Sequence, residues 1–589
     1  MNEGNGNQNN RFLLILLVLS VAILIYQNSF QRNNNVHKTR VVFVKESRDK
    51  LWSNADPRLK MFKKYALDNF EKIFICPTIE SLMTVPASCP ERPKYRSLYN
   101  SSLFPLYQPS NPGPSTQTNG LRHVILAAIS LQKSLIFSYF SIHRTDKLSR
   151  TDKVPFGARV DVSELCKLLK VKSDLELFRK SINELYSSNL TDDQNLDDNN
   201  QDVDPLNPFS FERSNINYKL TKIISFTLGC NQGCSEKQWH VEDKNIKKYL
   251  RYFTHIGGFI DAEFIPSKGL IYDIIPRKST NSLEKLFIER NLRYDSPNVI
   301  GMANPHTWIY KGFYKLIDAG GAYRQMNPIN ADGHAPKSNF TRAEKYLNTN
   351  FNLIKDLYRH TGHPKFIKQL AVNFIQTYFE NINYVGVHWR FNTDDFLGIG
   401  QKTSALYKIK EALINDINQT NIIDDPKTRQ ILGAGKGIPS SMRIEIFKTL
   451  LKPEYFLNKL IPHFEKHLGN ETNIIFISSP QNVAEIFNKI GRNFIYQNRT
   501  FKIFTGIDTF QYLKSQAYSK STSCELLKEY LGDVLSTFEK ELMVLSKSFY
   551  RARPSNWSFN VQGQRFGLYK DLSHDRVIYD VFLNRDRKK

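Results

Sequence analysis

The sequence has little that would mark it as a nucleic-acid-binding protein. It has no zinc-finger spacing, no RNP-like aromatic strand, no concentrated basic helix and no internal repeat, so nucleic acid is not expected as a partner. Acidic residues are also scarce relative to basic ones, with 57 against 81 and a net charge of +24. This excess is typical either of a lysine-rich solvated surface or of attraction to an anionic partner.

Cysteine is sparse, with six residues in 589. An even number permits three disulfides in an oxidising compartment, with 15 possible pairings. The short separations favour two local pairs, Cys76 with Cys89 and Cys230 with Cys234. The second pair has His240 nearby but no further pair at metal-ligand spacing, so a zinc site is disfavoured.

One apolar run, Phe12 to Tyr26, is broken only by Ser20 and spans 15 residues. A plasma-membrane helix needs about 20 residues, whereas a shorter run suits the thinner bilayers of the early secretory pathway. A cleaved signal peptide is the alternative, but the first 11 residues hold one Arg and one Glu, and no Ala-x-Ala pattern follows the run. We therefore expect an uncleaved signal anchor over residues 12–30 behind a cytoplasmic tail, residues 1–11.

The orientation of this anchor is expected to be type II, with the body of the protein in the ER or Golgi lumen. The positive-inside rule opposes this, because Arg32, Lys38 and Arg40 fall on the lumenal side. The remaining features outweigh it. Seven Asn-x-Ser/Thr sequons agree with a secretory protein, although a chain so rich in asparagine has about this number by chance. The sequons begin at Asn100, Asn189, Asn339, Asn418, Asn470, Asn498 and Asn556.

A chain of 589 residues is too long for one core. An apolar content of 41% with 12% aromatic residues argues against disorder. We expect a polar stem over residues 31–65, an N-terminal lobe over 66–380 and a C-terminal lobe over 381–589. The acidic stretch 189–208 contains almost no apolar residues and is interpreted as a surface loop within the first lobe.

The C-terminal lobe alternates predicted helices and strands, which is typical of a parallel α/β sheet of the Rossmann type. Helices are predicted at 365–380, 441–468, 482–490 and 524–548, and strands at 383–388, 473–479 and 501–504. The first half is less regular. A helix is predicted from Gly120 to Lys133 and a strand at 135–140, and Gly120 just before a helix amino terminus would let a ligand approach free backbone N–H groups.

The strand at 383–388 runs into charged residues, beginning with His388 and Arg390. Open α/β sheets bind ligands at the carboxyl ends of their strands, and an arginine fork suits phosphate oxygens. This strand end is therefore predicted to bind an anion such as a nucleotide diphosphate. Trp389 points to the opposite face and is expected in the core. Asp394 and Asp395 are adjacent and do not form the Asp-x-Asp motif, so a manganese site is not expected.

Four stretches together resemble the GDP-fucose protein O-fucosyltransferase family, over most of residues 70–570. The resemblance implies a GT-B fold of two Rossmann-like lobes facing a cleft, GDP-fucose as donor and no metal or other cofactor. It also implies a secreted protein or a glycan as acceptor. The matching stretches are residues 119–140 and 154–170, the strand end at 386–396 (GVHWRFNTDDF), and residues 549–565 (FYRARPSNWSFNVQGQR).

The resemblance assigns roles to individual residues. Arg390 would bind the diphosphate and stabilise its charge during transfer, and His388 would position the nucleotide. Asp394 or Asp395 would bind guanine or ribose, or support Arg390. Further donor contacts are implied for the residues Gly120, Arg122, Ser555, Asn556, Trp557, Ser558 and Arg565. The family prefers a second Ser or Thr where Asn556 stands.

The acceptor base is the weakest part of this resemblance. One branch of the family uses a glutamate before the first helix, but residues 107–123 (YQPSNPGPSTQTNGLRH) contain no carboxylate. Two alternatives follow: a strongly dissociative transfer in which the departing phosphate takes the proton, or loss of activity. The sequence therefore leaves three functions open. These are fucose transfer to Ser or Thr of secretory proteins, fucose transfer to a glycan, and a catalytically silent lumenal binding protein.

Overall fold

The structure is a computed structural model that describes part of the chain, all of it within one compact unit, residues 61–589. The described residues are 74–98, 102–106, 113–142, 146, 148–150, 153–173, 176, 220–226, 271–275, 299–303, 353, 355–379, 383–391, 440–468, 472–518, 523–552, 555–568 and 575–582. Within these ranges no helix is long and apolar enough to cross a membrane. The expected anchor, the stem and the acidic loop lie outside them, as do Cys230 and Cys234.

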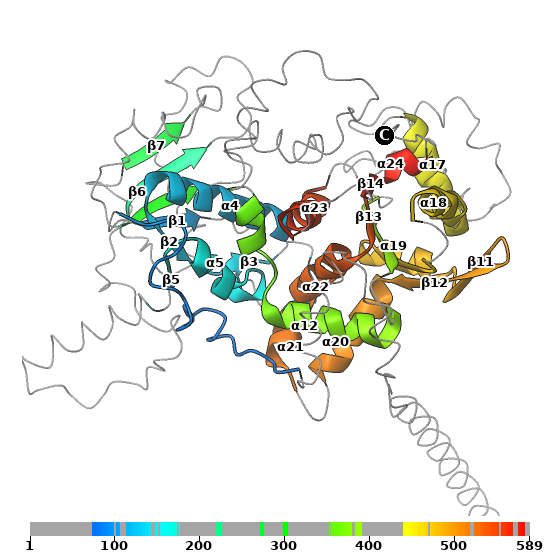
Figure 1. Ribbon diagram of the computed structural model, residues 1–589, viewed down its shortest axis with the longest axis horizontal. Helices are drawn as coiled ribbons and strands as arrows, with labels where there is room; N and C mark the ends of the chain where they lie inside the picture. The colour runs from blue at the N-terminus through cyan, green and yellow to red at the C-terminus, as the bar shows by residue number, and fades with distance from the viewer. Residues whose placement is uncertain are drawn as a thin grey trace, which may run out of the picture. The chain divides into compact units, whose positions relative to one another are not determined.

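The fold is mixed α/β, and the described residues form two separate six-stranded sheets (Figure 1). The N-terminal sheet has the order β5-β2-β1-β8-β6-β7, and all its strands are parallel. The bounds are β1 Ser102–Leu106, β2 Ser134–Phe137, β5 Val171–Ser173, β6 Leu220–Phe226, β7 Ile271–Ile275 and β8 Val299–Ala303. A small antiparallel pair, β3 Phe140–Ser141 and β4 Lys153–Val154, stands apart from this sheet.

The C-terminal sheet has the order β11-β12-β10-β9-β13-β14. Its strands are parallel except for β11, which forms a hairpin with β12. When β11 is left out and the other five strands are renumbered in chain order, their order across the sheet is 3-2-1-4-5, which is the Rossmann order. β9 is the first of these strands in the chain and lies in the middle of them, with later strands on both sides. The bounds are β9 Tyr384–His388, β10 Ile474–Ser478, β11 Asn493–Tyr496, β12 Arg499–Thr505, β13 Ser548–Arg551 and β14 Arg576–Val577.

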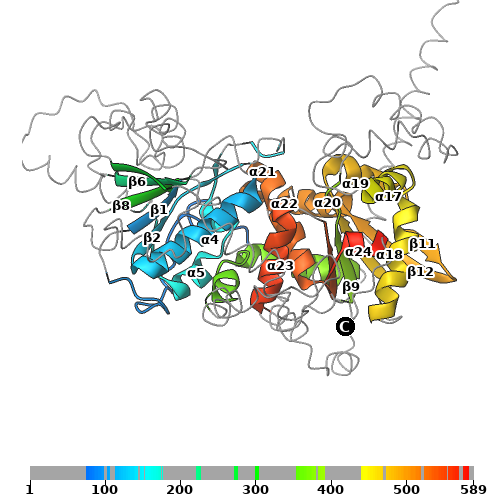
Figure 2. The same cartoon turned by 90° about the horizontal axis from the view of Figure 1, so that it is seen from above.

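Helices connect and cover these strands. The longer ones are α4 Pro114–Leu131, α12 Lys365–Phe374 with its π-helical continuation η6 Ile375–Phe379, α17 Ser440–Leu451, α18 Pro453–Leu468, α20 Gly506–Ala517, α22 Leu531–Leu545 and α23 Asn556–Leu568. The shorter ones are η1 Phe156–Ala158, α5 Val162–Leu168, α19 Gln481–Asn488, α21 Glu525–Glu529 and α24 Ile578–Phe582. Helix α23 contacts both α4 and α22 (Figure 2). Helix α22 also contacts α12 and β9.

Helix α22 packs closely on the central strand β9. All five residues of β9 are buried. A Cβ atom on Gly386 would lie 2.6 Å from the Met543 sulfur and 3.0 Å from the Ser546 hydroxyl. Only glycine permits this approach, so the helix can lie directly against the strand that ends in His388.

Trp389 lies in the core of the C-terminal lobe, as expected from strand alternation. Its side chain has no exposed surface, and its ring makes edge contacts with Phe456 at 5.0 Å and Phe487 at 5.4 Å. Its indole N–H donates to the Phe391 carbonyl at 2.9 Å, which satisfies the only polar atom of the ring. The residue therefore anchors the strand end instead of contacting a ligand.

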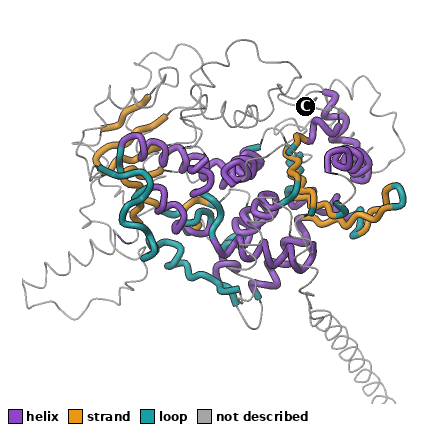
Figure 3. Tube along the Cα trace, in the orientation of Figure 1, coloured by secondary structure: helices purple, strands orange, loops and turns teal. Residues whose placement is uncertain are grey.

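Residues 74–98 cross the surface mostly as loop (Figure 3). Two disulfides hold this segment: Cys76 with Cys524, 448 residues away, and Cys89 with Cys166, 77 residues away. The prediction of a Cys76–Cys89 bridge was wrong. The cost of loop closure grows only slowly with length, so sequence separation is a poor guide when tertiary packing brings distant cysteines together.

Several predicted elements are confirmed, and others are corrected. The strands predicted at 383–388, 473–479 and 501–504 correspond to β9, β10 and β12. The single helix predicted at 441–468 is two helices, α17 and α18, with Pro453 at the start of the second. The helix predicted from Gly120 begins six residues earlier, at Pro114. Proline at the first helical position is favourable because its missing N–H is not needed there.

Candidate functional site

The candidate site lies where β9 and β13 end side by side. The strand order of the C-terminal sheet reverses between these two strands, and open α/β sheets bind ligands at such a switch point. His388 is the last residue of β9, and α23 follows β13 after a short connection. The His388 Nδ1 and the Ser558 hydroxyl oxygen are 2.6 Å apart. The sequence had assigned both residues to donor binding, and the structure brings them into contact.

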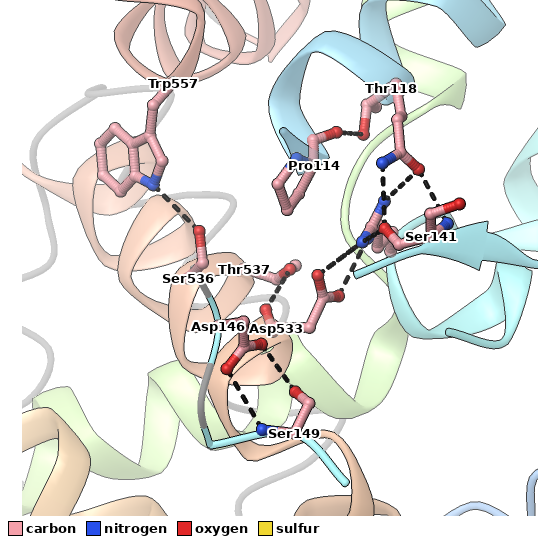
Figure 4. Close-up of polar contacts among 11 residues, drawn as sticks. Pro114, Thr118, Ser141, Asp146, Ser149, Asp533, Ser536, Thr537 and Trp557 are labelled. Carbon is pink, nitrogen blue, oxygen red and sulfur yellow. Dashed lines mark hydrogen bonds and ion pairs between the residues drawn. The ribbon is translucent and has the colours of Figure 1, made fainter. Parts of the chain in front are cut away.

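The first turn of α23 presents polar and aromatic groups to this strand end. The Ser555 hydroxyl caps the helix by accepting the Ser558 backbone N–H at 3.4 Å. Trp557 stacks on His388 with ring centroids 4.1 Å apart and an interplanar angle of 21°. Its indole N–H donates to the Ser536 hydroxyl on α22 at 3.1 Å (Figure 4). The amino terminus of a helix carries a partial positive charge that favours anions.

Arg390 and His388 have different environments although one residue separates them. Arg390 is exposed, whereas His388 is buried. Burial, followed by the nearby positive charges of Arg390 and Lys540, holds the pKa of His388 well below its usual value. The imidazole is therefore neutral at physiological pH. It can hold the Ser558 hydroxyl, while the guanidinium of Arg390 supplies the positive charge at this strand end.

Lys540 is a second cation beside the site, and the sequence analysis did not identify it. It lies on α22 and is 5% exposed, with its ammonium 6.0 Å from the centroid of the Trp557 ring. Burial lowers its pKa to about 7, with Asp533 acting in the opposite direction. The available signal was a charged triplet, Glu539-Lys540-Glu541, inside a helix segment that is otherwise apolar.

Asn556 and Asn560 join α23 to the start of α4. The Asn556 amide donates to the Thr116 hydroxyl at 2.7 Å, and the Asn560 amide donates to the Ser115 carbonyl at 2.8 Å. Asn556 therefore uses its side-chain nitrogen, the atom that would carry a glycan, in a partly buried contact. The sequon at Asn498 differs, because that residue is exposed in the hairpin turn with φ 63°.

Gly120 and Arg122 lie inside α4, and both are buried. Gly120 is therefore not at a helix amino terminus, so the reason for placing it near the donor was wrong. The Arg122 guanidinium donates to Thr361 at 2.8 Å and to Asn119 at 2.9 Å, and it also contacts Asn560. These contacts give Arg122 a structural role between α4 and α23, and donor contact by either residue remains a prediction.

Arg565 is buried and engaged with protein groups. Its guanidinium pairs with both oxygens of Asp575, at 2.8 and 2.7 Å. It also donates to the backbone carbonyls of Val544 and Ser546, at 2.8 and 2.7 Å. Arg565 thus ties α23 to the end of α22 and to the residues before β14, and these contacts differ from the donor contact that the resemblance implied.

A buried ion pair lies at the first turn of α22. Arg159, which follows η1, pairs with Asp533 through two of its nitrogens, with the shortest contact at 2.7 Å. The same guanidinium donates to the side chain of Gln117 at 3.0 Å and to the Ser141 carbonyl at 2.7 Å. Asp533 and Ser141 are labelled in Figure 4. The pair connects the first turn of α22 with α4 and the β3–β4 pair.

Asp394 and Asp395 lie outside the described residues, so their predicted contacts to guanine or ribose stay predictions. Within the described part of the chain, no group of three or more His, Cys, Asp or Glu side chains is placed to hold a metal ion. The described residues around the end of β9 offer positive charge, from Arg390 and Lys540, and hydrogen-bond donors.

No protein-family model matches the sequence, and no curated protein matches it. Solved structures are similar at low identity. POFUT1 in complex with GDP is 11% identical, covering 81% of this chain and 98% of that one, with a TM-score of 0.37. POFUT1 in complex with GDP-fucose is 13% identical, with coverages of 81% and 98% and a TM-score of 0.36. A mutant of Arabidopsis thaliana FUT1 in complex with GDP is 10% identical, with coverages of 86% and 76% and a TM-score of 0.30.

Proposed function

We propose that this protein is an inverting, metal-independent fucosyltransferase that transfers fucose from GDP-fucose to Ser or Thr of secretory-pathway proteins. The observation that carries the proposal is the contact between His388 and the first turn of α23 at the switch point of the C-terminal sheet. Arg390 follows His388 by two residues and acts electrostatically on its ring, and a cation near a helix amino terminus suits a diphosphate. Fucose and guanine as parts of the donor follow from the sequence resemblance.

In the proposed mechanism the protein stabilises the leaving group. Negative charge grows on the β-phosphate as the bond between the sugar and the phosphate breaks, and a fixed cation at that point lowers the barrier. Arg390 is the cation that meets this charge. Backbone N–H groups in the first turn of α23 and the hydroxyls of Ser555 and Ser558 are donors at the same end of the sheet. The neutral ring of His388 holds Ser558 in place.

The acceptor proton has no carboxylate in residues 107–123 to receive it. In this proposal the bond between the anomeric carbon and the phosphate breaks first, and the bond from the acceptor oxygen to that carbon forms on the opposite face. The acceptor oxygen then loses its proton to solvent, and the departed phosphate takes up a proton from solvent. This route needs a loose transition state with strong stabilisation of the phosphate, which increases the demand on Arg390. Transfer to a glycan hydroxyl uses the same donor chemistry, and an acceptor screen separates the two.

We also propose that the chain is a single-pass type II protein whose body lies in the ER or Golgi lumen. The apolar run at residues 12–26 and the two disulfides support this, because disulfides persist in oxidising compartments. Protease treatment of intact microsomes tests it. The C-terminus is expected to be protected, and digestion without detergent would contradict the topology.

A thermal-shift titration with GDP and GDP-fucose is the first test of the donor. Both nucleotides should raise the unfolding temperature, because a ligand that binds only the folded state stabilises it. Absence of any shift would favour a silent binding protein that does not recognise this donor. Labelled GDP-fucose offered with folded disulfide-rich domains and with glycans then identifies the acceptor class.

A further inference from the structure

Lys540 is a buried cation with no matching anion among the residues that the structure describes. Its side chain is 5% exposed, and its ammonium makes no hydrogen bond or ion pair with any described residue. The carboxylates next to it in α22 are directed elsewhere. Glu539 accepts the Ser478 and Thr509 hydroxyls at 2.6 and 2.7 Å, and Glu541 pairs with His363 at 2.8 Å.

Two other buried cations of the C-terminal half and its surroundings pair with carboxylates. Arg159 pairs with Asp533 and Arg565 with Asp575, each at 2.7 Å. Burying a charge without a partner costs free energy. An ammonium in this position therefore either loses its proton or binds an anion that enters from outside the protein.

The surroundings of Lys540 favour the second alternative. Its ammonium lies 6.0 Å from the Trp557 ring, and that ring stacks on His388 at the end of β9. Both Lys540 and Arg390 act electrostatically on His388. The lysine is therefore close to the anion-attracting start of α23, a helix of 13 residues, and on the side of the strand end where the proposed diphosphate lies.

We propose that Lys540 is a further diphosphate-binding residue, whose ammonium pairs with a phosphate oxygen of a nucleoside diphosphate bound between Arg390 and the first turn of α23. The proposal rests on the proposed function for the identity of the nucleotide. The pairing itself needs only a bound diphosphate.

Binding should change the protonation of Lys540. The charged and titratable groups that face it are Asp533 and Glu541 on α22, Arg122 on α4, Arg159 after η1, His363 before α12, and His388 and Arg390 at the end of β9. Most of these are cationic or neutral, and burial already lowers the pKa of Lys540 to about 7. A diphosphate adds negative charge, raises this pKa and draws one proton from solvent onto the amine above neutral pH.

Calorimetric titration of the full-length protein with GDP at pH 6.5 and 8.5 tests the proposal, in two buffers of different ionisation enthalpy. Wild type should take up close to one proton per GDP at pH 8.5. Lys540→Met should weaken GDP binding at least tenfold, abolish the proton uptake and leave guanosine binding unchanged. Lys528→Met, on the neighbouring helix α21, is the matched control and should behave as wild type. The unfolding temperature of each variant shows whether it folds.

The outcomes also separate this proposal from the proposed function. Wild type that binds inorganic pyrophosphate through Lys540 but does not bind GDP would support the lysine site and refute the nucleotide donor. Wild type that transfers fucose, with GDP affinity in Lys540→Met unchanged within twofold, would overturn the lysine site alone. Loss of turnover in Lys540→Met with unchanged GDP affinity and proton uptake would also overturn it, because the lysine would then act on the acceptor.

Discussion

His388 and Ser558 are 170 residues apart in the chain, yet the Nδ1 of the imidazole and the hydroxyl oxygen lie 2.6 Å apart. This contact joins the end of β9, two residues before Arg390, to the first turn of α23. Because burial and nearby cations hold the pKa of His388 well below its usual value, the ring stays neutral near pH 7 and the contact does not depend on a charged histidine.

Replacing Ser558 with alanine should loosen this strand end. A buried ring nitrogen loses its partner, which costs about 1–3 kcal/mol, and the variant should bind GDP roughly fivefold to tenfold more weakly while remaining folded. Calorimetric titration with GDP measures this. Ser515→Ala on α20, which also loses a serine hydroxyl, should bind GDP like wild type. Equal affinity of Ser558→Ala and wild type would show that the contact does not position the site.

The buried pair between Arg159 and Asp533 should be important for stability. Asp533→Asn removes the negative charge but keeps the size of the side chain, and it leaves an uncompensated guanidinium, for which the expected cost is about 3–5 kcal/mol. Denaturant unfolding followed by circular dichroism measures the loss. Glu525→Gln, which breaks the exposed pair with Lys528, should cost about 1 kcal/mol or less. Similar small effects from both variants would refute the structural role of the buried pair.

Glu539 should make stability depend on pH. Burial raises its pKa to about 7 from an ordinary 4.5, against the hydrogen bonds from Ser478 and Thr509. The folded protein therefore keeps a proton that the unfolded chain releases between these values. The stabilisation is complete below pH 4.5 and is lost as the pH rises through 7.

A glutamine at this position cannot titrate. The stability of wild type relative to Glu539→Gln should fall by on the order of 2 kcal/mol between pH 5 and 8. Unfolding temperatures of both proteins measured across this pH range check the prediction. Glu485→Gln, a substitution at an exposed glutamate, is the control. A difference that stays constant with pH would show that Glu539 is ionised throughout.

The disulfide pattern is open to direct mapping. Non-reducing digestion and mass spectrometry should find peptides that link Cys76 to Cys524 and Cys89 to Cys166. A Cys524→Ser variant should lose about 2–5 kcal/mol of stability, because the bridge closes a long loop. A linked peptide containing Cys76 and Cys89 would contradict the structure.

The sequence predicted the C-terminal sheet better than the rest of the fold. Buried strands such as β9 and β10 are continuous apolar runs, and a run of this kind is a local signal. The start of α4 was missed because its residues, PSTQTN, resemble a loop. Gln117 and Asn119 are tolerated there since their side chains bind Arg159 and Arg122, and such contacts are not visible in a local pattern.

The candidate site shows the same division. His388 and Ser558 were identified because they belong to short motifs that resemble a family. Lys540 was missed, since its significance depends on the lack of an anionic partner within the described part of the chain and on the distance to Trp557. Asp533 was missed for a related reason, because its partner Arg159 is 374 residues away in the chain.

The most direct test of the proposed function is the turnover of GDP-fucose by Arg390→Ala. Arg390 is exposed at the end of β9, so the variant should fold like wild type and bind guanosine normally. Its kcat/KM for GDP-fucose should fall about a thousandfold, the scale expected when a fixed donor to the leaving group is removed. Arg150→Ala, an exposed arginine paired with Glu529, should keep wild-type turnover. Turnover of Arg390→Ala within threefold of wild type, or no turnover by wild type with any acceptor, would contradict the account.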